Sequence, residues 1–514
     1  MARNSTGRRS GGRSGNKRRS GPAIKQAHWS IPFNSDTPTS PLPPEGVAAI
    51  HDGAMRILEE IGIEFLNEEA ATILKKAGCT LEGENVRMDR HFVMEKIGLV
   101  PSQFTITPRN CERRITIGGK HIVFGNVSSP PNCSDLDRGR RTGDRASFRE
   151  LVKFTQYFNC IHFAAGYPVE PLDIHPSVRH LDCLYDKLTL SDKVTHGYCL
   201  GTERIEDAME MVRIASGLSN EEFEAAPHMY TNINSSSPLK HDWPMLDGLM
   251  RMTRRGQPTI VTPFTLAGAM APITMAGAVM QSVAEALAAI VLVQCIRPGT
   301  PSVMGSFTSN VDMKTGAPAF GTPDYVRATQ MAGQMARFYH LPLRTANATA
   351  ANCPDAQSAW EAMMSLWAAL TSGSNIVYHA AGWLEGGLCA SYEKFIMDCE
   401  MIQQMVASMQ PVGFTKDDLA FDVIKEVGCN GHFFGAQHTQ ERYENAFYTP
   451  FVSDWSNYEN WRDAGSVQTP ERANKIWKKI LADYQAPAMD EAIREQLADF
   501  VARRKSEGGA PTDY

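Results

Sequence analysis

Short apolar segments of this 514-residue chain are followed by amide, hydroxyl and aromatic side chains that could bind a small molecule. Lys and Arg are scarce at these positions, so the set is poorly suited to holding a sugar phosphate, which needs positive charge or a dedicated glycine turn. The polar candidates are Asn232, Asn234, Ser306, Asn347, His379 and Glu385, and the aromatic candidates are Tyr167, Phe264, Phe307 and Trp383. For each aromatic ring, packing in the protein core is the alternative.

The cysteine and histidine spacing gives no metal site. The chain has 11 cysteines, an odd number without C-x-x-C spacing, and no Cys or His pair has zinc-finger or H-E-x-x-H spacing. We therefore predict no metal and reduced thiols, as in a cytoplasmic protein.

A repeated unit must position the candidate residues: a short apolar strand, a polar loop and a helix of about four turns. Strands are predicted at 121–124, 162–165, 195–200, 228–232, 259–262, 302–306, 343–346 and 375–379. Helices are predicted near 146–158, 177–190, 203–216, 243–255, 274–294, 323–338, 355–371 and 391–408. The helix predictions rest on apolar spacing, as in residues 355–371, where one stripe contains Ala356, Trp360, Met363, Met364 and Trp367. On the last helix, Glu393 and Glu400 lie seven apart, and we predict a structural role for both.

Eight alternating β and α units predict an α/β fold, a TIM (β/α)8 barrel over residues 121–410, with the candidate residues at the carboxyl ends of its strands. An open doubly wound sheet is the rival, but the glycine-rich turn expected after its first strand is missing. Residues 31–120 form an N-terminal helical and β lead-in, and residues 411–514 a C-terminal helical extension.

The charge is divided unevenly along the chain. Eight of the 51 basic residues and none of the 57 acidic residues lie in residues 1–30, which we predict to be a disordered tail. The remaining chain carries a net charge of −14, which argues against a nucleic-acid-binding core. The apolar run at 265–280 contains Pro272 and is shorter than the roughly 20 residues of a membrane span. The N-terminus lacks the apolar segment of a signal peptide.

Five motifs in order resemble the trimethylamine methyltransferase family, and the likeness extends from about residue 45 to the C-terminus. They are N-I-N-S-S-S-P-L (232–239), P-D-A-Q-S-A-W-E (354–361), H-A-A-G-W-L-E-G-G-L (379–388), S-Y-E-K-F-I-M-D-C-E (391–400) and G-H-F-F-G-A-Q-H-T (431–439). The resemblance implies a TIM-barrel enzyme that moves a methyl group from an amine to the cobalt of a corrinoid (cobalamin) on a separate small protein. It implies no cofactor bound by this chain itself.

The same resemblance narrows the substrate. Founding members of the family carry pyrrolysine in the loop before the P-D-A-Q helix, whereas residues 346–353 here read A-N-A-T-A-A-N-C. The chain is thus similar to the non-pyrrolysine branch, which implies a quaternary amine such as glycine betaine. A quaternary ammonium leaves as a neutral amine, so positioning and electrostatics suffice for its demethylation.

The resemblance also implies roles for the candidates. A quaternary ammonium is bound by aromatic faces, here those of Phe264, Phe307, Trp383 and Tyr167. A betaine carboxylate would need the amide, hydroxyl and imidazole donors. His379 and Glu385 are the catalytic candidates, with Glu385 orienting His379 or offsetting the ammonium. His432 and His438 either shape the opening where the corrinoid protein docks or pack structurally.

Several alternatives stay open. Trimethylamine or another methylated amine could be the substrate, the chain could be a different TIM-barrel enzyme such as a lyase, or it could bind betaine without catalysis. Pairing into a homo-oligomer is also open.

Overall fold

The computed structural model describes residues 24–512, and residues 1–23 of the predicted tail at 1–30 lie outside this range. Six parallel strands form the central sheet in the order β6-β17-β16-β13-β11-β9. They are β6 (Val123–Asn126), β9 (Thr231–Ile233), β11 (Thr259–Val261), β13 (Ser302–Gly305), β16 (Leu343–Ala346) and β17 (Ile376–Ala381). Nearly all their residues are buried, as expected for parallel strands covered on both faces. The predicted α/β class is confirmed.

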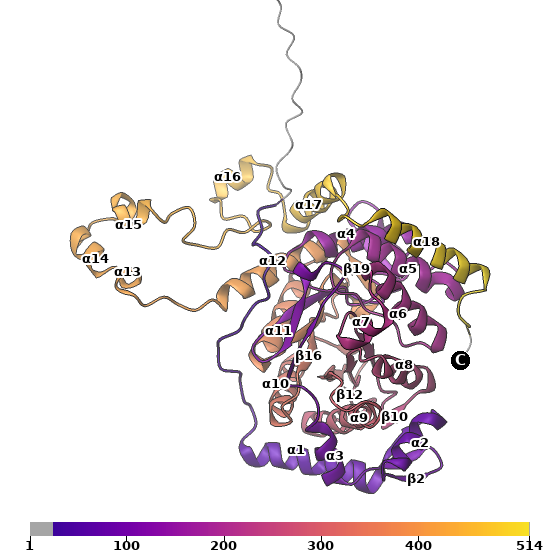
Figure 1. The fold of residues 1–514 in the computed structure, drawn as a ribbon. Helices are drawn as coiled ribbons and strands as arrows, with labels where there is room; N and C mark the ends of the chain where they lie inside the picture. Colours follow the sequence, from indigo (N-terminus) through magenta and orange to yellow (C-terminus); the bar gives the residue numbers. More distant parts are fainter. Residues whose placement is uncertain (1–23, 513–514) are drawn as a thin grey trace, which may run out of the picture.

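Helices alternate with these strands and surround the sheet (Figure 1). They are α4 (Arg145–Tyr157), α5 (Pro176–Leu190), α6 (Thr202–Ser216), α7 (Asn220–Ala225), α8 (Trp243–Arg254), α9 (Met275–Ile296), α10 (Pro323–Phe338), α11 (Ala356–Ser372) and α12 (Tyr392–Ser408). Eight of the nine match predicted helices within two residues at each end. Side-chain caps support several of the starts, such as Asp144 before α4 and Asp355 before α11.

Two of the predicted strands, 162–165 and 195–200, are wrong as regular strands. They form only isolated parallel bridges, which join Phe163 to Gly125 and Val194, and His196 to Tyr230. In both segments a histidine side chain takes the place of a backbone acceptor. Nδ1 of His162 accepts from the Phe124 N–H, and Nε2 of His196 accepts from the Asn232 N–H. A regular backbone ladder is therefore interrupted along both segments.

The apolar stripe predicts the helix α11 correctly, but most of its large side chains face outward. Trp360 and Trp367 are 59% and 54% exposed, and Met363 and Met364 are exposed as well. The inward face carries smaller residues such as Ala362, Ser365 and Ala369, which let the helix approach its neighbours closely.

The N-terminal part covers the helix α9. Its elements are α1 (Pro44–Arg56), β1 (Ile63–Phe65), α2 (Glu68–Lys76), β2 (Thr80–Glu82), β3 (Asn85–Arg87) and α3 (Arg90–Ile97). The three helices pack against α9, which is long and apolar enough to cross a membrane. Because most of α9 is buried inside the protein, it is a core helix. Residues 24–30 are also packed: Gln26 donates to the Tyr157 carbonyl and Trp29 contacts His162.

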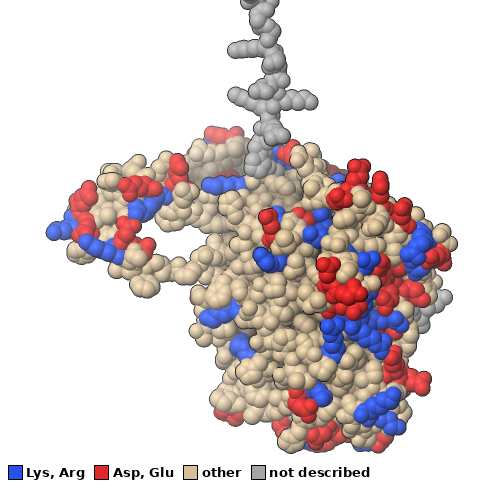
Figure 2. All heavy atoms as spheres, viewed as in Figure 1, with Lys and Arg blue, Asp and Glu red and all other residues tan. Residues whose placement is uncertain are grey.

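The C-terminal extension consists of a packed part and an arm that stands away from the body (Figures 1 and 2). Its helices are α13 (Lys416–Leu419), α14 (Phe421–Val427), α15 (Gln437–Gln440), α16 (Tyr458–Asp463), α17 (Thr469–Asp483) and α18 (Glu491–Ser506). Two carboxylates of α12 fasten the packed part: Glu393 accepts from Asn474 and Trp477, and Glu400 accepts from the Phe451 and Val452 N–H groups. The structural role predicted for both is confirmed.

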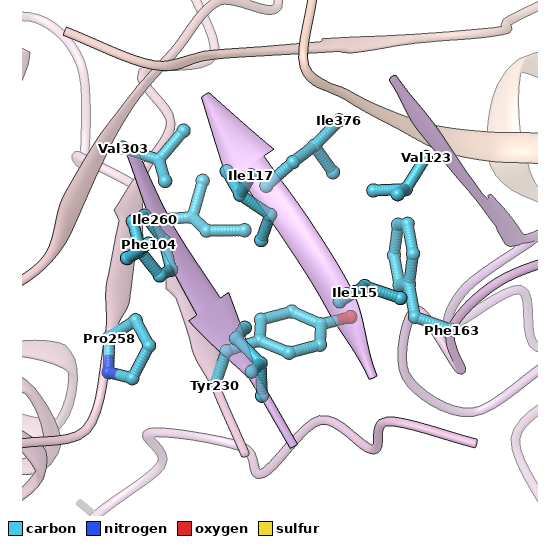
Figure 3. A pocket seen from close by; sticks show the side chains of 11 residues that line it. Phe104, Ile115, Ile117, Val123, Phe163, Tyr230, Pro258, Ile260, Val303 and Ile376 are labelled. Atoms are coloured by element: carbon cyan, nitrogen blue, oxygen red, sulfur yellow. The ribbon is translucent and has the colours of Figure 1, made fainter. Parts of the chain in front are cut away.

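A hairpin closes the end of the sheet where the parallel strands begin. Strands β4 (Gln103–Ile106) and β5 (Ile115–Gly118) pair antiparallel, and their apolar side chains point toward those of the sheet (Figure 3). Phe104 and Ile117 of the hairpin and Phe163, Ile260 and Val303 of the body line a residual cavity of about 10 Å³. That space is too small for any substrate, so a binding site must lie elsewhere.

Candidate active site

A cavity of about 330 Å³ lies at the carboxyl ends of the parallel strands. The following loops also contribute to it, including β18 (Trp383–Leu384) and the turn before β19 (Cys389–Ser391). It is lined by Ser128, Ser129, Ala165, His196, Tyr198, Asn232, Asn234, Met245, Thr262, Phe264, Phe307, Arg344, Tyr378, His379, Trp383, Gly386, Gly387 and Leu388. Six of the predicted site residues are among them: Asn232, Asn234, Phe264, Phe307, His379 and Trp383.

Aromatic rings form one wall of this cavity. Phe264 and Phe307 have ring centroids 5.1 Å apart, and the Trp383 ring meets Phe307 edge-on at 6.1 Å. The Trp383 indole N–H donates to the Thr349 carbonyl at 3.1 Å, which fixes its orientation. Such a wall presents negative ring faces that can hold a cation.

His379 lies in β17 with a left-handed backbone, φ +54°, where the register of β17 against β6 shifts. Its Nδ1 accepts a hydrogen bond from the Ser128 N–H at 3.1 Å. Burial and the nearby Arg344 hold the pKa of His379 well below its ordinary value. The ring is therefore neutral at pH 7, and since Nδ1 is an acceptor, Nε2 carries the proton.

Arg344 of β16 is the one charged residue among the described residues that line the cavity. It is 3% exposed, and its guanidinium lies between the Tyr378 ring at 4.4 Å and the Phe307 ring at 5.5 Å. No carboxylate pairs with it among the described residues, and its Nε and Nη1 atoms lack hydrogen-bond partners there. Burial lowers the pKa of Arg344 to about 10, so the group stays charged at neutral pH. An unpaired buried cation of this kind is costly unless a ligand supplies the anion.

Amides and hydroxyls occupy another part of the lining. The side-chain amides of Asn232 and Asn234 lie 2.9 Å apart, and Thr262 Oγ1 donates to Asn232 at 2.7 Å. Their loop is held by the buried carboxylate of Glu285, which accepts from Ser237 Oγ at 2.6 Å and from the Leu239 N–H at 2.8 Å. Glu285 thereby positions the loop after β9, which forms the polar side of the cavity.

Four predicted site residues lie outside the lining. Tyr167 is buried behind Tyr198, whose hydroxyl accepts from the Tyr167 N–H. Asn347 donates to the Ala380 carbonyl, and Ser306 is buried in the continuation of β13. Nε of Arg140 donates to both carboxylate oxygens of Glu385, at 2.9 and 3.0 Å, so the partner of Glu385 is Arg140 and not His379.

No group of three or more His, Cys, Asp or Glu side chains that could hold a metal occurs within residues 24–512. All 11 cysteines are free thiols. The chemistry of the cavity therefore depends on one guanidinium, neutral donors and aromatic rings.

Comparison with known proteins decides the family. The family model described as trimethylamine methyltransferase matches residues 8–509. The chain belongs to the trimethylamine methyltransferase family. The membership that the five motifs predict is confirmed, and so is the prediction of a methyltransferase.

Characterised relatives in this family match over most of their length. The chain is 38% identical to a glycine betaine methyltransferase of Desulfitobacterium hafniense (strain Y51), over 91% of this chain and 98% of the relative. It is 28% identical to a proline betaine:corrinoid methyltransferase of Eubacterium limosum, over 88% and 96%. The crystal structure of the Methanosarcina barkeri monomethylamine methyltransferase has a similar fold, with a TM-score of 0.51 at 11% identity over 90% and 88%.

The loop at residues 346–353, before α11, has a structural role. Thr349 Oγ1 and the N–H groups of Ala350 and Ala351 all donate to the buried carboxylate of Glu361 on α11. No residue of 346–353 lines the cavity. The wall that this loop supports is made by Trp383.

Sequence reasoning missed Arg344, Tyr198 and His196. The first had a detectable signal, because Arg344 stands inside L-P-L-R-T-A, an otherwise uncharged strand predicted to be buried. A charged residue in such a strand must either pair or serve a ligand. The other two lie in a segment whose irregular backbone concealed which side chains face the cavity.

Proposed function

We propose that this enzyme transfers a methyl group from a carboxylated quaternary amine, with glycine betaine as the substrate, to the cobalt of a corrinoid carried by a separate protein. The observation that carries the proposal is Arg344, a buried cation without an anionic partner in the described cavity. A site for a bare cation would not place a guanidinium beside the ligand. A betaine is a zwitterion, and its carboxylate would supply the missing anion.

Two donors are placed to bind that carboxylate together. Arg344 Nη2 and His379 Nε2 lie 3.5 Å apart, and since Nε2 carries the proton, both point N–H groups at the space between them. An oxygen accepting from both would be held by a charge-assisted and a neutral hydrogen bond. We therefore assign His379 to substrate binding at the reacting centre.

The ammonium would then lie against the aromatic wall. One methylene separates the two charges of glycine betaine, so a carboxylate on Arg344 leaves the trimethylammonium near Phe307, which contacts Arg344, Phe264 and Trp383 alike. Each ring face contributes roughly 0.5–2 kcal/mol. Longer substrates such as carnitine would extend beyond this wall.

The methyl transfer itself requires little acid–base catalysis. The N–CH₃ bond breaks with both electrons on nitrogen, giving neutral dimethylamino nitrogen, while the methyl group forms a bond to the reduced cobalt acceptor. The chain orients the methyl toward the mouth and keeps water from the reacting centre. No carboxylate lines the described cavity, and His379 with Nδ1 occupied is not available as a base, which disfavours a lyase.

We also infer that the sheet closes into the (β/α)8 barrel expected from the alternating pattern. Isolated parallel bridges connect the two edge strands of the sheet. They join Gly125 of β6 to Phe163, Phe163 to Val194, and His196 to Tyr230, which directly precedes β9, and so support closure. The free thiols support a reducing compartment, the cytoplasm.

The test is incubation of the enzyme with cob(I)alamin and a panel of glycine betaine, proline betaine, carnitine, choline and trimethylamine, following methylcobalamin by its spectrum. We expect methylation from glycine betaine and none from trimethylamine. Faster methylation from choline than from every betaine would overturn the carboxylate assignment. Product formation without any corrinoid would overturn the reaction class, and betaine binding without turnover would make the chain a binding protein.

A further inference from the structure

The arm of the C-terminal extension, residues 411–447, begins just after α12 and loops out from the body before the chain returns at Tyr448 (Figure 1). Within the described chain, every hydrogen bond and ion pair given for these residues joins two residues of the arm, such as Arg442 with Asp417. Figure 2 shows open space between the arm and the body. The arm is therefore not held by its own chain.

Large apolar side chains cover the arm without being buried. Phe414 is 85% exposed, Phe421 68% and Phe434 80%. The others that share this exposure are Val412, Leu419, Ile424, Phe433, Tyr443 and Phe447. An extended segment that exposes so many apolar groups is unusual for a surface that faces only water.

The α11 face, formed by Trp360, Met363, Met364 and Trp367, is a second exposed apolar surface. The body below the arm, where α11 lies, shows few charged side chains, whereas Lys, Arg, Asp and Glu gather on the opposite side (Figures 1 and 2). One chain thus carries a projecting apolar segment and an uncovered apolar face.

We propose that the arm of one copy covers the α11 face of a second copy of this chain. Two copies related by a two-fold axis can make the exchange reciprocally, which is the smallest closed arrangement. The exposed side chains of the arm and the α11 face present on the order of 1,000 Å² of apolar surface per copy. Stable interfaces bury roughly 800 Å² per partner, so the exchange alone would sustain a dimer.

The position of the arm favours a second copy over the corrinoid protein. The C-terminal end of α12 lies where the parallel strands begin, because Gln403 and Ala407 share a surface cavity with His162. The substrate cavity lies at the opposite, carboxyl ends of the strands. A protein docked on the arm could not present cobalt to the substrate, and His432 and His438, which lie on the arm, do not shape that opening.

The exchange can be tested on the full chain by measuring its mass in solution over a range of concentrations. The arm variant is F414D/F421D/F434D and the face variant is W360E/W367E. Both change exposed residues, so circular dichroism and thermal midpoints should match those of the wild type. The matched control is Ile61→Asp, which alters an equally exposed apolar residue on the N-terminal part.

We expect the wild type and the Ile61→Asp control to dimerise, and each of the other variants to weaken dimerisation at least tenfold. A mixture of arm and face variants should form a mixed dimer, because one intact arm then meets one intact face. A monomeric wild type would overturn the proposal, since the arm would then fold onto its own chain or remain uncovered. Unchanged dimers in the arm variant would overturn it too, and so would a mixture of the two variants that stays monomeric. Protection of the arm from proteolysis only after a corrinoid protein is added would also overturn it.

Discussion

Nη2 of Arg344 and Nε2 of His379 lie 3.5 Å apart in the wall of the cavity, and both are hydrogen-bond donors. Two donors facing each other without an acceptor repel weakly and are left unsatisfied. An oxygen of a bound carboxylate resolves both problems at once. In the function proposed above, the pair would therefore favour ligands that carry an anion next to their cation.

Replacing Arg344 by Met should remove this preference while keeping the side-chain volume. Hydrogen bonds to charged groups contribute about 1.5–3 kcal/mol, so KM for glycine betaine should rise roughly 10- to 100-fold. Choline, which has no carboxylate, should lose little or gain. Steady-state kinetics with both substrates measures the ratio, and Arg140→Gln, which removes the partner of Glu385 outside the cavity, is the control. Equal losses on both substrates would argue against carboxylate binding.

Replacing His379 by Asn should retain a donor near Arg344, whereas replacement by Ala should remove it. We expect KM for glycine betaine to rise several-fold more in His379→Ala than in His379→Asn, as one neutral hydrogen bond contributes about 0.5–1.5 kcal/mol. Because the pKa of His379 is held well below its ordinary value, kcat/KM should show no inflection from this residue between pH 6 and 8. An inflection there that disappears in His379→Asn would contradict a permanently neutral ring.

Shortening the aromatic wall should weaken binding of the ammonium specifically. For Phe307→Leu we expect a loss of roughly 2- to 30-fold in affinity for glycine betaine, the range of one ring face. The carbon isostere 3,3-dimethylbutanoate has the same shape and carboxylate without the positive charge, so its inhibition constant should change less. Phe33→Leu, at an exposed ring far from the cavity, is the control. Equal losses for both ligands would indicate packing alone.

Three buried histidines should make the fold sensitive to acid. Burial lowers the pKa of His162 to about 3 and holds the pKa values of His196 and His379 well below their ordinary values. Unfolded histidines bind protons near pH 6.5, so their stabilising effect is complete above that pH and is lost as the pH falls toward the folded pKa. Each residue lowers the free energy of unfolding by about 1.4 kcal/mol per pH unit in that window. Urea denaturation from pH 7 to 5 should show this decrease in the free energy of unfolding. In His162→Gln the slope should be smaller by the contribution of one proton, about 1.4 kcal/mol per pH unit.

The buried carboxylate of Glu285 should control both stability and binding. Replacing it by Gln leaves Ser237 and the Leu239 N–H with a poorer acceptor, which should cost about 1–3 kcal/mol in the free energy of unfolding. The loosened loop should also raise KM, since it carries Asn234 and directly follows β9, which contains Asn232. Urea denaturation and kinetics check the two effects, with the exposed Glu60→Gln as control. A stability loss without any change in KM would mean that the loop does not position the substrate.

The alternation of strands and helices could be predicted because burial on both faces of parallel strands leaves continuous apolar runs. The ends of those runs identified Asn232, Phe264, Phe307 and His379, since residues at the carboxyl ends of parallel strands meet at the same edge of the sheet. The apolar stripe of residues 355–371 predicted the helix α11 correctly, although its large residues point outward and smaller ones pack.

The remainder depends on information that spacing does not contain. Arg344 lies inside a strand, and whether its side chain points at the cavity follows from the register of β16 against its neighbours. Tyr198 lines the cavity and Tyr167 does not, although both follow segments predicted as strands. The ion pair of Glu385 with Arg140 joins residues 245 positions apart, which no local pattern reveals.

The burial of α9 beneath α1, α2 and α3 has a consequence for biosynthesis. A helix of this length and apolarity could be recognised as a membrane span by proteins that bind apolar segments of a nascent chain. Its three covering helices come from residues 44–97 and leave the ribosome well before Met275. N-terminal segments can fold first during synthesis, so α1, α2 and α3 are available to cover α9 as soon as it emerges. We expect this order of elements to limit the recognition of α9 as a membrane span.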